Sequence, residues 1–295
     1  MSQAKQIAAG SIVIGALVLA LKSAAWWTTG SAALFSDAAE SVVNVLASTV
    51  AFVALHMAAR PADQNHPYGH DKAEFFAAVI EGVLIVIAAA AILNHAWATW
   101  QSPGLIEAPL TGMALNAVAT VMNLGWGLML IRRGRTLRSP ALVADGNHLM
   151  TDVVTSVTVI AGLAIAIASG STRADAILAA LVAAYVLFSG VQVLRESVGG
   201  LMDEAPAADI VERIRVLVGE HAQGAIEIHD LRTRHAGRLT FLDFHLVVPG
   251  DMTVAASHTI CDRIEAALMA EMEGVVTTIH VEPDAKAKHR GVLVL

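Results

Sequence analysis

A short polar pattern inside an apolar run has the residue types of a metal site. Asp145, His148 and Asp152 are spaced by three and then by four residues. A helix places residues at this spacing on one face. Carboxylates and neutral imidazoles bind divalent transition metals, so this face could supply part of a metal site.

The same pattern occurs earlier in the chain. Asp37, Glu40 and Asn44 fall at the same offsets, again inside an apolar run. Both runs are long enough to span a bilayer, where an ionisable group costs about 2.5–3.5 kcal/mol on insertion scales. Two membrane helices that carry one polar pattern therefore predict a shared intramembrane site. Their Asp, Glu, His and Asn side chains suffice for four ligands to a divalent metal.

The composition is that of a membrane protein. Of 295 residues, 56% are hydrophobic and only 15% are charged, and the mean hydropathy is +0.61, whereas soluble domains are about 25% charged. The net charge of −7, with dispersed basic residues, argues against nucleic acid as a partner. The single cysteine, Cys261, excludes an internal disulfide and a multi-cysteine zinc site.

Six apolar runs reach or exceed the roughly 20 residues that cross a bilayer. We expect these helices at residues 7–28, 33–58, 74–98, 109–131, 141–168 and 173–198. Basic residues gather in the loops of one side, with only Arg173 on the other, so the positive-inside rule predicts that both termini are cytoplasmic. Tryptophans cluster at the opposite helix ends, as an aromatic belt would: Trp26, Trp27, Trp97 and Trp100. We expect no cleavable signal, because the first run is too long for one.

The chain changes character from about residue 206. The periodicity predicts a helix, two strands, a helix and a strand, at residues 209–221, 226–234, 239–248, 253–272 and 275–281. This α-β-β-α-β order fits a small α+β sandwich of the ferredoxin-like kind. We therefore predict a six-helix transmembrane domain at residues 1–203, a cytosolic α+β domain at 204–284 and a loose C-terminal tail at 285–295.

These features resemble the cation diffusion facilitator family of divalent metal/proton antiporters, and in particular its bacterial zinc/iron efflux branch. Two further segments carry the resemblance, Asp63–Glu74 (DQNHPYGHDKAE) and His229–Arg234 (HDLRTR). The match covers nearly the whole chain. It implies a homodimeric transporter of the inner membrane, not an enzyme, that exports metal from the cytoplasm and has a metallochaperone-like cytosolic domain. The implied partners are protons, membrane lipid and a divalent ion: Zn²⁺ first, with Fe²⁺, Mn²⁺, Co²⁺ and Cd²⁺ as further candidates.

The resemblance assigns the transport site to Glu40, Asn44, His148 and Asp152. Many family members carry Asp or His at the position of Glu40 and Asp at that of Asn44. With neutral His148, the carboxylates Glu40 and Asp152 balance a divalent ion. We hypothesise that Asn44 weakens binding and relaxes the preference for zinc; the alternative is a tolerated isostere. Asp37 and Asp145 are candidates for ligand support, a proton path or helix packing. His148 and Asp152 could also be an interhelical hydrogen-bonded pair.

The loop after the second predicted helix offers a second ligand set. Asp63, His66 and His70 follow a D-x₂-H-x₃-H spacing that puts three ligand groups within reach of one ion. The resemblance makes this a metal site at the cytoplasmic surface of the membrane; a solvated polar loop is the alternative. It also pairs Lys72 with Asp203 near the dimer interface.

The resemblance further implies a two-metal centre in the cytosolic domain. Its ligands would be His229, His245, His258, His280 and Glu282. The branch usually has Asp at the position of Glu282, so its longer side chain puts the bridging of two ions in question. Ligands from separate elements meet only in the folded or dimeric domain, which couples metal binding to packing. Three other histidines have no such match, and we expect them to be solvated: His221, His235 and His289.

Two other function classes remain open. An intramembrane metalloenzyme would use the same ligands to activate water, but the chain lacks H-E-x-x-H and G-x-S-x-G. Four protein ligands also leave no obvious position for that water. A metal sensor or scaffold would place the function in the cytosolic domain and would survive mutation of Asp152, which a transporter would not.

Overall fold

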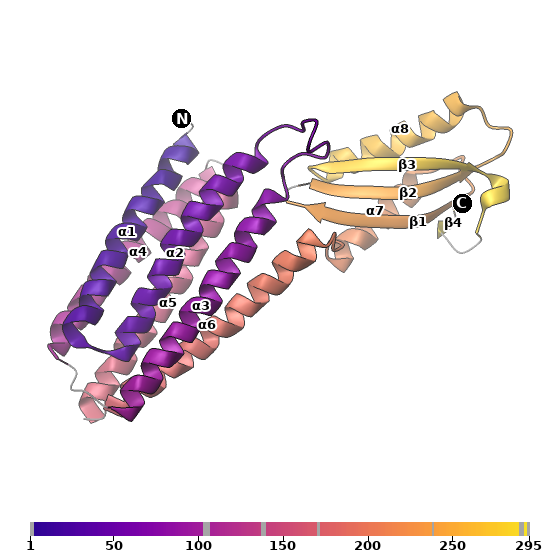
Figure 1. Cartoon of the computed structure of the whole chain (residues 1–295). Coiled ribbons are helices and arrows are strands. Elements are labelled where there is room, and N and C mark those ends of the chain that lie inside the picture. The colour runs from indigo at the N-terminus through magenta and orange to yellow at the C-terminus, as the bar shows by residue number, and fades with distance from the viewer. Residues whose placement is uncertain are drawn as a thin grey trace. The chain divides into compact units, whose positions relative to one another are not determined.

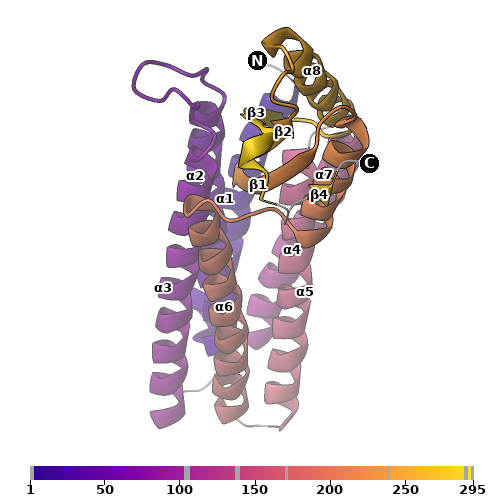
Figure 2. The same cartoon turned by 90° about the vertical axis from the view of Figure 1, so that its right-hand side faces the viewer.

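The computed structural model describes residues 3–102, 107–136, 140–169, 172–237, 239–288 and 292–293. Six long helices lie side by side in the first two thirds of the chain (Figures 1 and 2). They are α1 Gln3–Thr29, α2 Ala32–Ala58, α3 Ala73–Gln101, α4 Pro109–Thr136, α5 Pro140–Ser169 and α6 Thr172–Leu201. Each contains a span long and apolar enough to cross a membrane, which confirms the six predicted helices.

The chain separates into two compact units. The first comprises Met1–His56 and Ala77–Arg195, and the second comprises Met57–Phe76 and Glu196–Leu295. The loop between α2 and α3 and the end of α6 therefore cluster with the C-terminal part of the chain. This places the segment with Asp63, His66 and His70 in the second unit.

At the turn between α1 and α2, protein groups hydrogen-bond to the helix ends. Gly30 ends α1 with φ +65° and donates its N–H to the carbonyl of Trp26 at 2.8 Å, as a left-handed cap does. Ser31 caps α2, and the buried carboxylate of Asp175 on α6 accepts the N–H of Ala32 at 2.6 Å. A carboxylate at a helix N-terminus is stabilised by the helix dipole.

Small residues let the membrane helices approach closely. A Cβ at Gly146 of α5 would lie 2.9 Å from the carbonyl oxygen of Gly127 on α4, and one at Gly82 of α3 would lie 2.7 Å from Leu194 of α6. Helices in a membrane associate through such close contacts, because lipid tails are as apolar as the helix surfaces and the hydrophobic effect does not bring the helices together.

The C-terminal domain has the predicted α-β-β-α-β order. Its elements are α7 Ala208–His221, β1 Glu227–Ala236, β2 Leu239–Val248, α8 Val254–Glu271, β3 Val275–Pro283, the 3₁₀ turn η1 Asp284–Lys286 and β4 Val292–Leu293. The sheet order is β3-β2-β1-β4, with β2 antiparallel to β1 and parallel to β3. The predicted fold class is thus confirmed, and each strand lies within a few residues of its predicted range.

One face of this sheet forms the core. Leu242, Phe244 and Leu246 of β2 pack in one buried cluster with residues of α7 and α8 such as Ile214 and Ile264. Because side chains alternate along a strand, the odd-numbered residues of β2 project from the opposite face. That face carries the histidines discussed below.

The structure differs from the predicted loose tail. Val292 and Leu293 form β4, which pairs antiparallel with Ile228 and Glu227 of β1. The two-residue strand is too short to give a periodic signal in the sequence, and only its partner β1 defines it. His289 lies outside the described residues.

Candidate metal sites

Three carboxylates from α2 and α5 gather inside the helical unit. Ligand oxygens of Asp37, Glu40 and Asp152 all lie within 4.8 Å of one another. One oxygen of Asp37 and one of Glu40 are buried without a hydrogen-bond partner among the described residues. Carboxylates this close in a low-dielectric surrounding require cations or bound protons to compensate their charge. The group therefore fits a cation site.

An ammonium group that the sequence analysis did not use lies among these carboxylates. Lys22 of α1 is 1% exposed, and its Nζ donates to Asp37 Oδ1 at 2.8 Å and to Asp152 Oδ2 at 2.9 Å. The sequence did carry a signal, because a lone lysine within the first apolar run needs a counter-charge. Asp37, predicted in a supporting role, belongs to the buried group itself.

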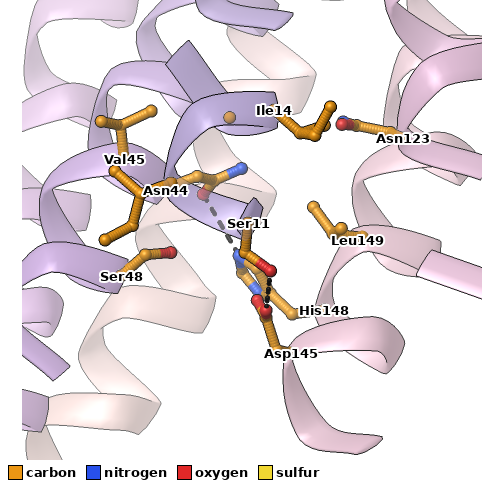
Figure 3. A pocket seen from close by; sticks show the side chains of 11 residues that line it. Ser11, Ile14, Asn44, Val45, Ser48, Asn123, Asp145, His148 and Leu149 are labelled. Atoms are coloured by element: carbon orange, nitrogen blue, oxygen red, sulfur yellow. Dashed lines mark hydrogen bonds between the residues drawn. The ribbon is translucent and has the colours of Figure 1, made fainter. Parts of the chain in front are cut away.

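Asn44 connects His148 to these carboxylates. Its Nδ2 donates to Asp152 Oδ1 at 3.3 Å, and its Oδ1 lies 3.2 Å from His148 Nε2. Figure 3 shows the Asn44 and His148 side chains pointing toward one another. The four predicted transport ligands thus lie along one path instead of around one point. A metal ion bound by both Asn44 Oδ1 and His148 Nε2 would replace the contact between these two atoms.

A small pocket opens beside this path, between α1, α2, α4 and α5 (Figure 3). Asp145 lines it together with Asn44 and His148. Its Oδ2 accepts a hydrogen bond from Ser11 Oγ at 2.8 Å, and Ser11 in turn accepts from Trp126 Nε1 at 2.9 Å. Asp145 therefore presents a carboxylate on the approach to His148.

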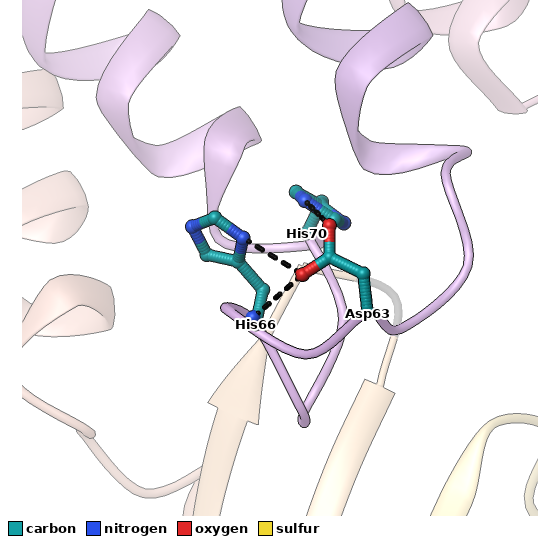
Figure 4. Close-up of side chains that lie close together, drawn as sticks. All are labelled: Asp63, His66 and His70. Atoms are coloured by element: carbon teal, nitrogen blue, oxygen red, sulfur yellow. Dashed lines mark hydrogen bonds and ion pairs between the residues drawn. The ribbon is translucent and has the colours of Figure 1, made fainter.

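The loop after α2 brings Asp63, His66 and His70 together (Figure 4). The carboxylate oxygens of Asp63 lie 3.3 Å from His66 Nδ1 and 3.4 Å from His70 Nε2. Gly69, with φ +89°, closes a tight turn by donating to the carbonyl of His66 at 3.0 Å. The backbone N–H of His66 also donates to Asp63 and lowers the pKa of its carboxyl group, so this ligand is ionised at neutral pH.

The predicted pair of Lys72 and Asp203 is present and has a third member. Lys72 Nζ donates to Asp203 Oδ1 at 2.8 Å, and Arg234 Nη1 donates to the same oxygen at 3.2 Å. These two contacts, that of Lys72 first, lower the pKa of Asp203. Asp203 thereby ties the start of α3 to the end of α6 and to β1.

Three predicted cytosolic ligands lie in one row across the sheet. His229 of β1 pairs with His245 of β2, which pairs with His280 of β3. A bulge between His229 and Arg232, where Asp230 has φ +53°, sets this register. Paired residues project from the same face, here the one opposite α7 and α8.

Glu282 lies among these histidines. Its oxygens are 3.3 Å from His229 Nε2, 3.4 Å from His245 Nδ1 and 3.7 Å from His280 Nε2. Both ring nitrogens of His229 and Nδ1 of His245 are buried without a hydrogen-bond partner in the described part of the chain. Since buried polar atoms are normally satisfied, this arrangement fits a metal ion held by His229, His245 and Glu282.

Among the described residues, His258 is the predicted ligand that lies apart from this group. It lies on α8, which covers the other face of the sheet, and its ring contacts Asp262 at 3.0 Å with a 70% exposed side chain. A hydrogen bond to its own backbone and the Asp262 carboxylate raise the pKa of His258. His221 and His235, predicted to be solvated, have local partners in the Leu217 carbonyl and the Thr240 hydroxyl.

Both the helical part and the C-terminal domain of the chain match known proteins. The family model of the cation efflux transmembrane domain matches residues 9–202, and that of the cation efflux protein cytoplasmic domain matches residues 206–284. An uncharacterized transporter of Synechocystis sp. is 40% identical over 281 residues, 95% of this chain and 90% of that protein. The cation-efflux pump FieF of Yersinia enterocolitica is 31% identical over 283 residues, 95% of this chain and 93% of that protein. The solved zinc form of CzrB is 48% identical and covers 29% of this chain and 98% of its own, with a TM-score of 0.28.

Proposed function

This chain belongs to the cation efflux family of multi-pass membrane transporters, also called cation diffusion facilitators, and we propose that it exports a divalent metal ion from the cytoplasm in exchange for protons. The buried group of Asp37, Glu40 and Asp152 carries this proposal. It is a cation site within helices of membrane-spanning length, which neither an inert anchor nor a sensor in the other unit requires.

Zinc is the metal that these ligands fit best. The proposed transport site combines Glu40, Asn44, His148 and Asp152, and imidazole with carboxylate suits zinc. Fe²⁺, Mn²⁺, Co²⁺ and Cd²⁺ are the further candidates. A neutral amide at Asn44 is a weaker ligand than a carboxylate, and this favours a less zinc-selective site.

The same ligands explain exchange for protons. Metal binds to neutral His148 and to ionised Glu40 and Asp152, so protonation of these groups and metal binding compete. When the metal leaves, the carboxylates again repel one another and histidine is available, and protons compensate the charge. A proton gradient across the membrane then drives metal out as protons return.

Membership of this family is also the basis on which we propose the topology, the dimer and the remaining metal sites. Both termini face the cytoplasm at an inner membrane, and the cytosolic domain forms a homodimer. Asp63, His66 and His70 bind metal at the cytoplasmic surface, whereas His229, His245 and Glu282, with His280 beside them, bind metal in the cytosolic domain. The contact between Lys72 and Asp203 positions the dimer.

Metal flux into proteoliposomes that contain a pH-sensitive dye tests the function. Zn²⁺, Fe²⁺, Mn²⁺, Co²⁺ and Cd²⁺ are presented separately to the wild type, to Asp152→Ala, and to Asp251→Ala as the matched control at an exposed aspartate. We expect metal-dependent proton movement in the wild type and in the control but not in Asp152→Ala. Absence of flux for every ion, with metal still bound by the purified protein, would overturn the proposal in favour of a sensor.

A further inference from the structure

Lys22 lies among the buried carboxylates of Asp37 and Asp152, and the exchange chemistry above gives it no role. Lysine is almost never fully buried unless it is paired. Here the ammonium group bridges two carboxylates of different helices, Asp37 of α2 and Asp152 of α5, at 2.8 and 2.9 Å. Ser156 Oγ donates a hydrogen bond to Asp37 Oδ1 at 2.9 Å, so Asp37 has a second polar partner besides Lys22.

Both oxygens of Asp152 are already engaged. Oδ2 accepts from Lys22 and from Asn123, and Oδ1 accepts from Asn44. Oδ2 therefore already has two donors, and a metal ion that takes this oxygen as a ligand must displace one of them. Lys22 carries a full positive charge, so it is the donor that a metal ion repels most strongly.

We propose that Lys22 is a tethered counter-ion that competes with the metal ion for Asp152. This inference rests on the proposed transport function. On metal binding the ammonium gives up Asp152 and keeps Asp37, which its flexible four-carbon stem permits. When the metal ion leaves, the ammonium returns to Asp152 and blocks this carboxylate from binding the metal ion again.

The charges of the site support this role. Lys22 neutralises one carboxylate, so the three carboxylates and the ammonium leave −2, which one divalent ion balances. A site without Lys22 would have an additional negative charge and would retain a divalent ion more strongly. Lys22 therefore lowers affinity in favour of release.

The test is Zn²⁺ binding to the full chain in detergent, at one pH and salt concentration. Binding to the transport site is the part of the signal that each variant loses when Asp152→Asn is added, which separates it from the loop and cytosolic sites. We expect Lys22→Met to tighten this binding by roughly tenfold or more, because a unit charge acting over a few ångströms inside a protein changes affinity by at least an order of magnitude.

In proteoliposomes the same variant should have a lower KM and a lower maximal rate, whereas a purely structural lysine would lower the rate without tightening binding. Lys288→Met, at an exposed lysine, is the control.

Two further variants keep the test decisive if Lys22→Met fails to fold. Lys22→Arg retains the charge and holds a carboxylate bidentately, so it should weaken Zn²⁺ binding several-fold. The double variant Lys22→Met with Asp37→Asn has the charge of the wild type but no competitor for Asp152, so it should still bind more tightly. Wild-type affinity in this double variant, or in folded Lys22→Met, would overturn the proposal. Loss of the Asp152-dependent signal from the wild type itself would instead refute the transport function.

Discussion

Asp203, just after α6, forms ion pairs with Lys72 before α3 and with Arg234 of β1. Replacing Asp203 tests how much these contacts stabilise the junction of the three segments. Its Oδ1 accepts from Lys72 at 2.8 Å and from Arg234 at 3.2 Å. The side chains of Lys72, Asp203 and Arg234 are 34%, 48% and 25% exposed, so solvent screens both ion pairs. Each pair then contributes about 0–1 kcal/mol, and we expect Asp203→Asn, which keeps the shape and removes the charge, to cost about 1 kcal/mol of local stability.

The backbone of Asp203 makes a second, separable contribution. Its φ is +62°, a left-handed conformation that Asp and Asn adopt more readily than other residues with a side chain. Asp203→Ala should therefore cost roughly 1 kcal/mol more than Asp203→Asn. Asp203→Gly should fall near the asparagine variant, because glycine adopts this conformation without strain.

The charge contribution also has a defined pH dependence. Lys72, and then Arg234, lower the pKa of Asp203 from its ordinary value of 3.8. A carboxyl group with a lower pKa in the folded state stabilises it fully above the ordinary value, and this stabilisation is lost as the pH falls through the lowered pKa. The difference between wild type and Asp203→Asn should therefore disappear in acid.

Amide hydrogen exchange of the full chain in detergent measures these effects. The reporter is a peptide containing His235, whose N–H donates to the carbonyl of Glu204 beside this junction. A loss of 1 kcal/mol corresponds to about fivefold faster exchange at equilibrium opening. Glu212→Gln, at an exposed acid of α7, is the control. Wild-type exchange in Asp203→Asn would refute the ion-pair argument, and equal exchange in the Asn and Ala variants would refute the backbone argument.

Three further predictions concern metal choice, the cytosolic site and helix packing. Asn44→Asp should raise the flux of Zn²⁺ relative to Mn²⁺ and Fe²⁺ in proteoliposomes, and an unchanged ranking would contradict a role for Asn44 in selectivity. Zn²⁺ at a hundredfold excess over its Kd should stabilise the cytosolic domain by about 2.7 kcal/mol in thermal unfolding; a chelator or Glu282→Gln should remove most of this gain. Gly146→Ala should destabilise the helical unit by about 1–3 kcal/mol through the contact with the carbonyl of Gly127. Gly125→Ala, whose Cβ would meet nothing within 4 Å, should be tolerated when unfolding is followed by circular dichroism.

The sequence alone predicted the six long helices and the α-β-β-α-β order, because their signals are local. Apolar length marks the six helices, and alternation marks β2, whose predicted and observed ranges coincide. The spacing of Asp37 and Glu40 places them on one face of α2 for the same reason. The loop ligands Asp63, His66 and His70 were also predictable, since so few residues separate them that any tight turn brings them together.

Only the tertiary structure decided which elements face one another. Lys22 reads in the sequence as a single charge in an apolar run, and packing alone places its ammonium between carboxylates 15 and 130 residues away. The same holds for His258, which a helix on the far face of the sheet keeps from Glu282, and for β4, which exists only through its pairing with β1. Spacing along the chain determines which side chains share a face, whereas the charges and packing of the whole fold determine what that face meets.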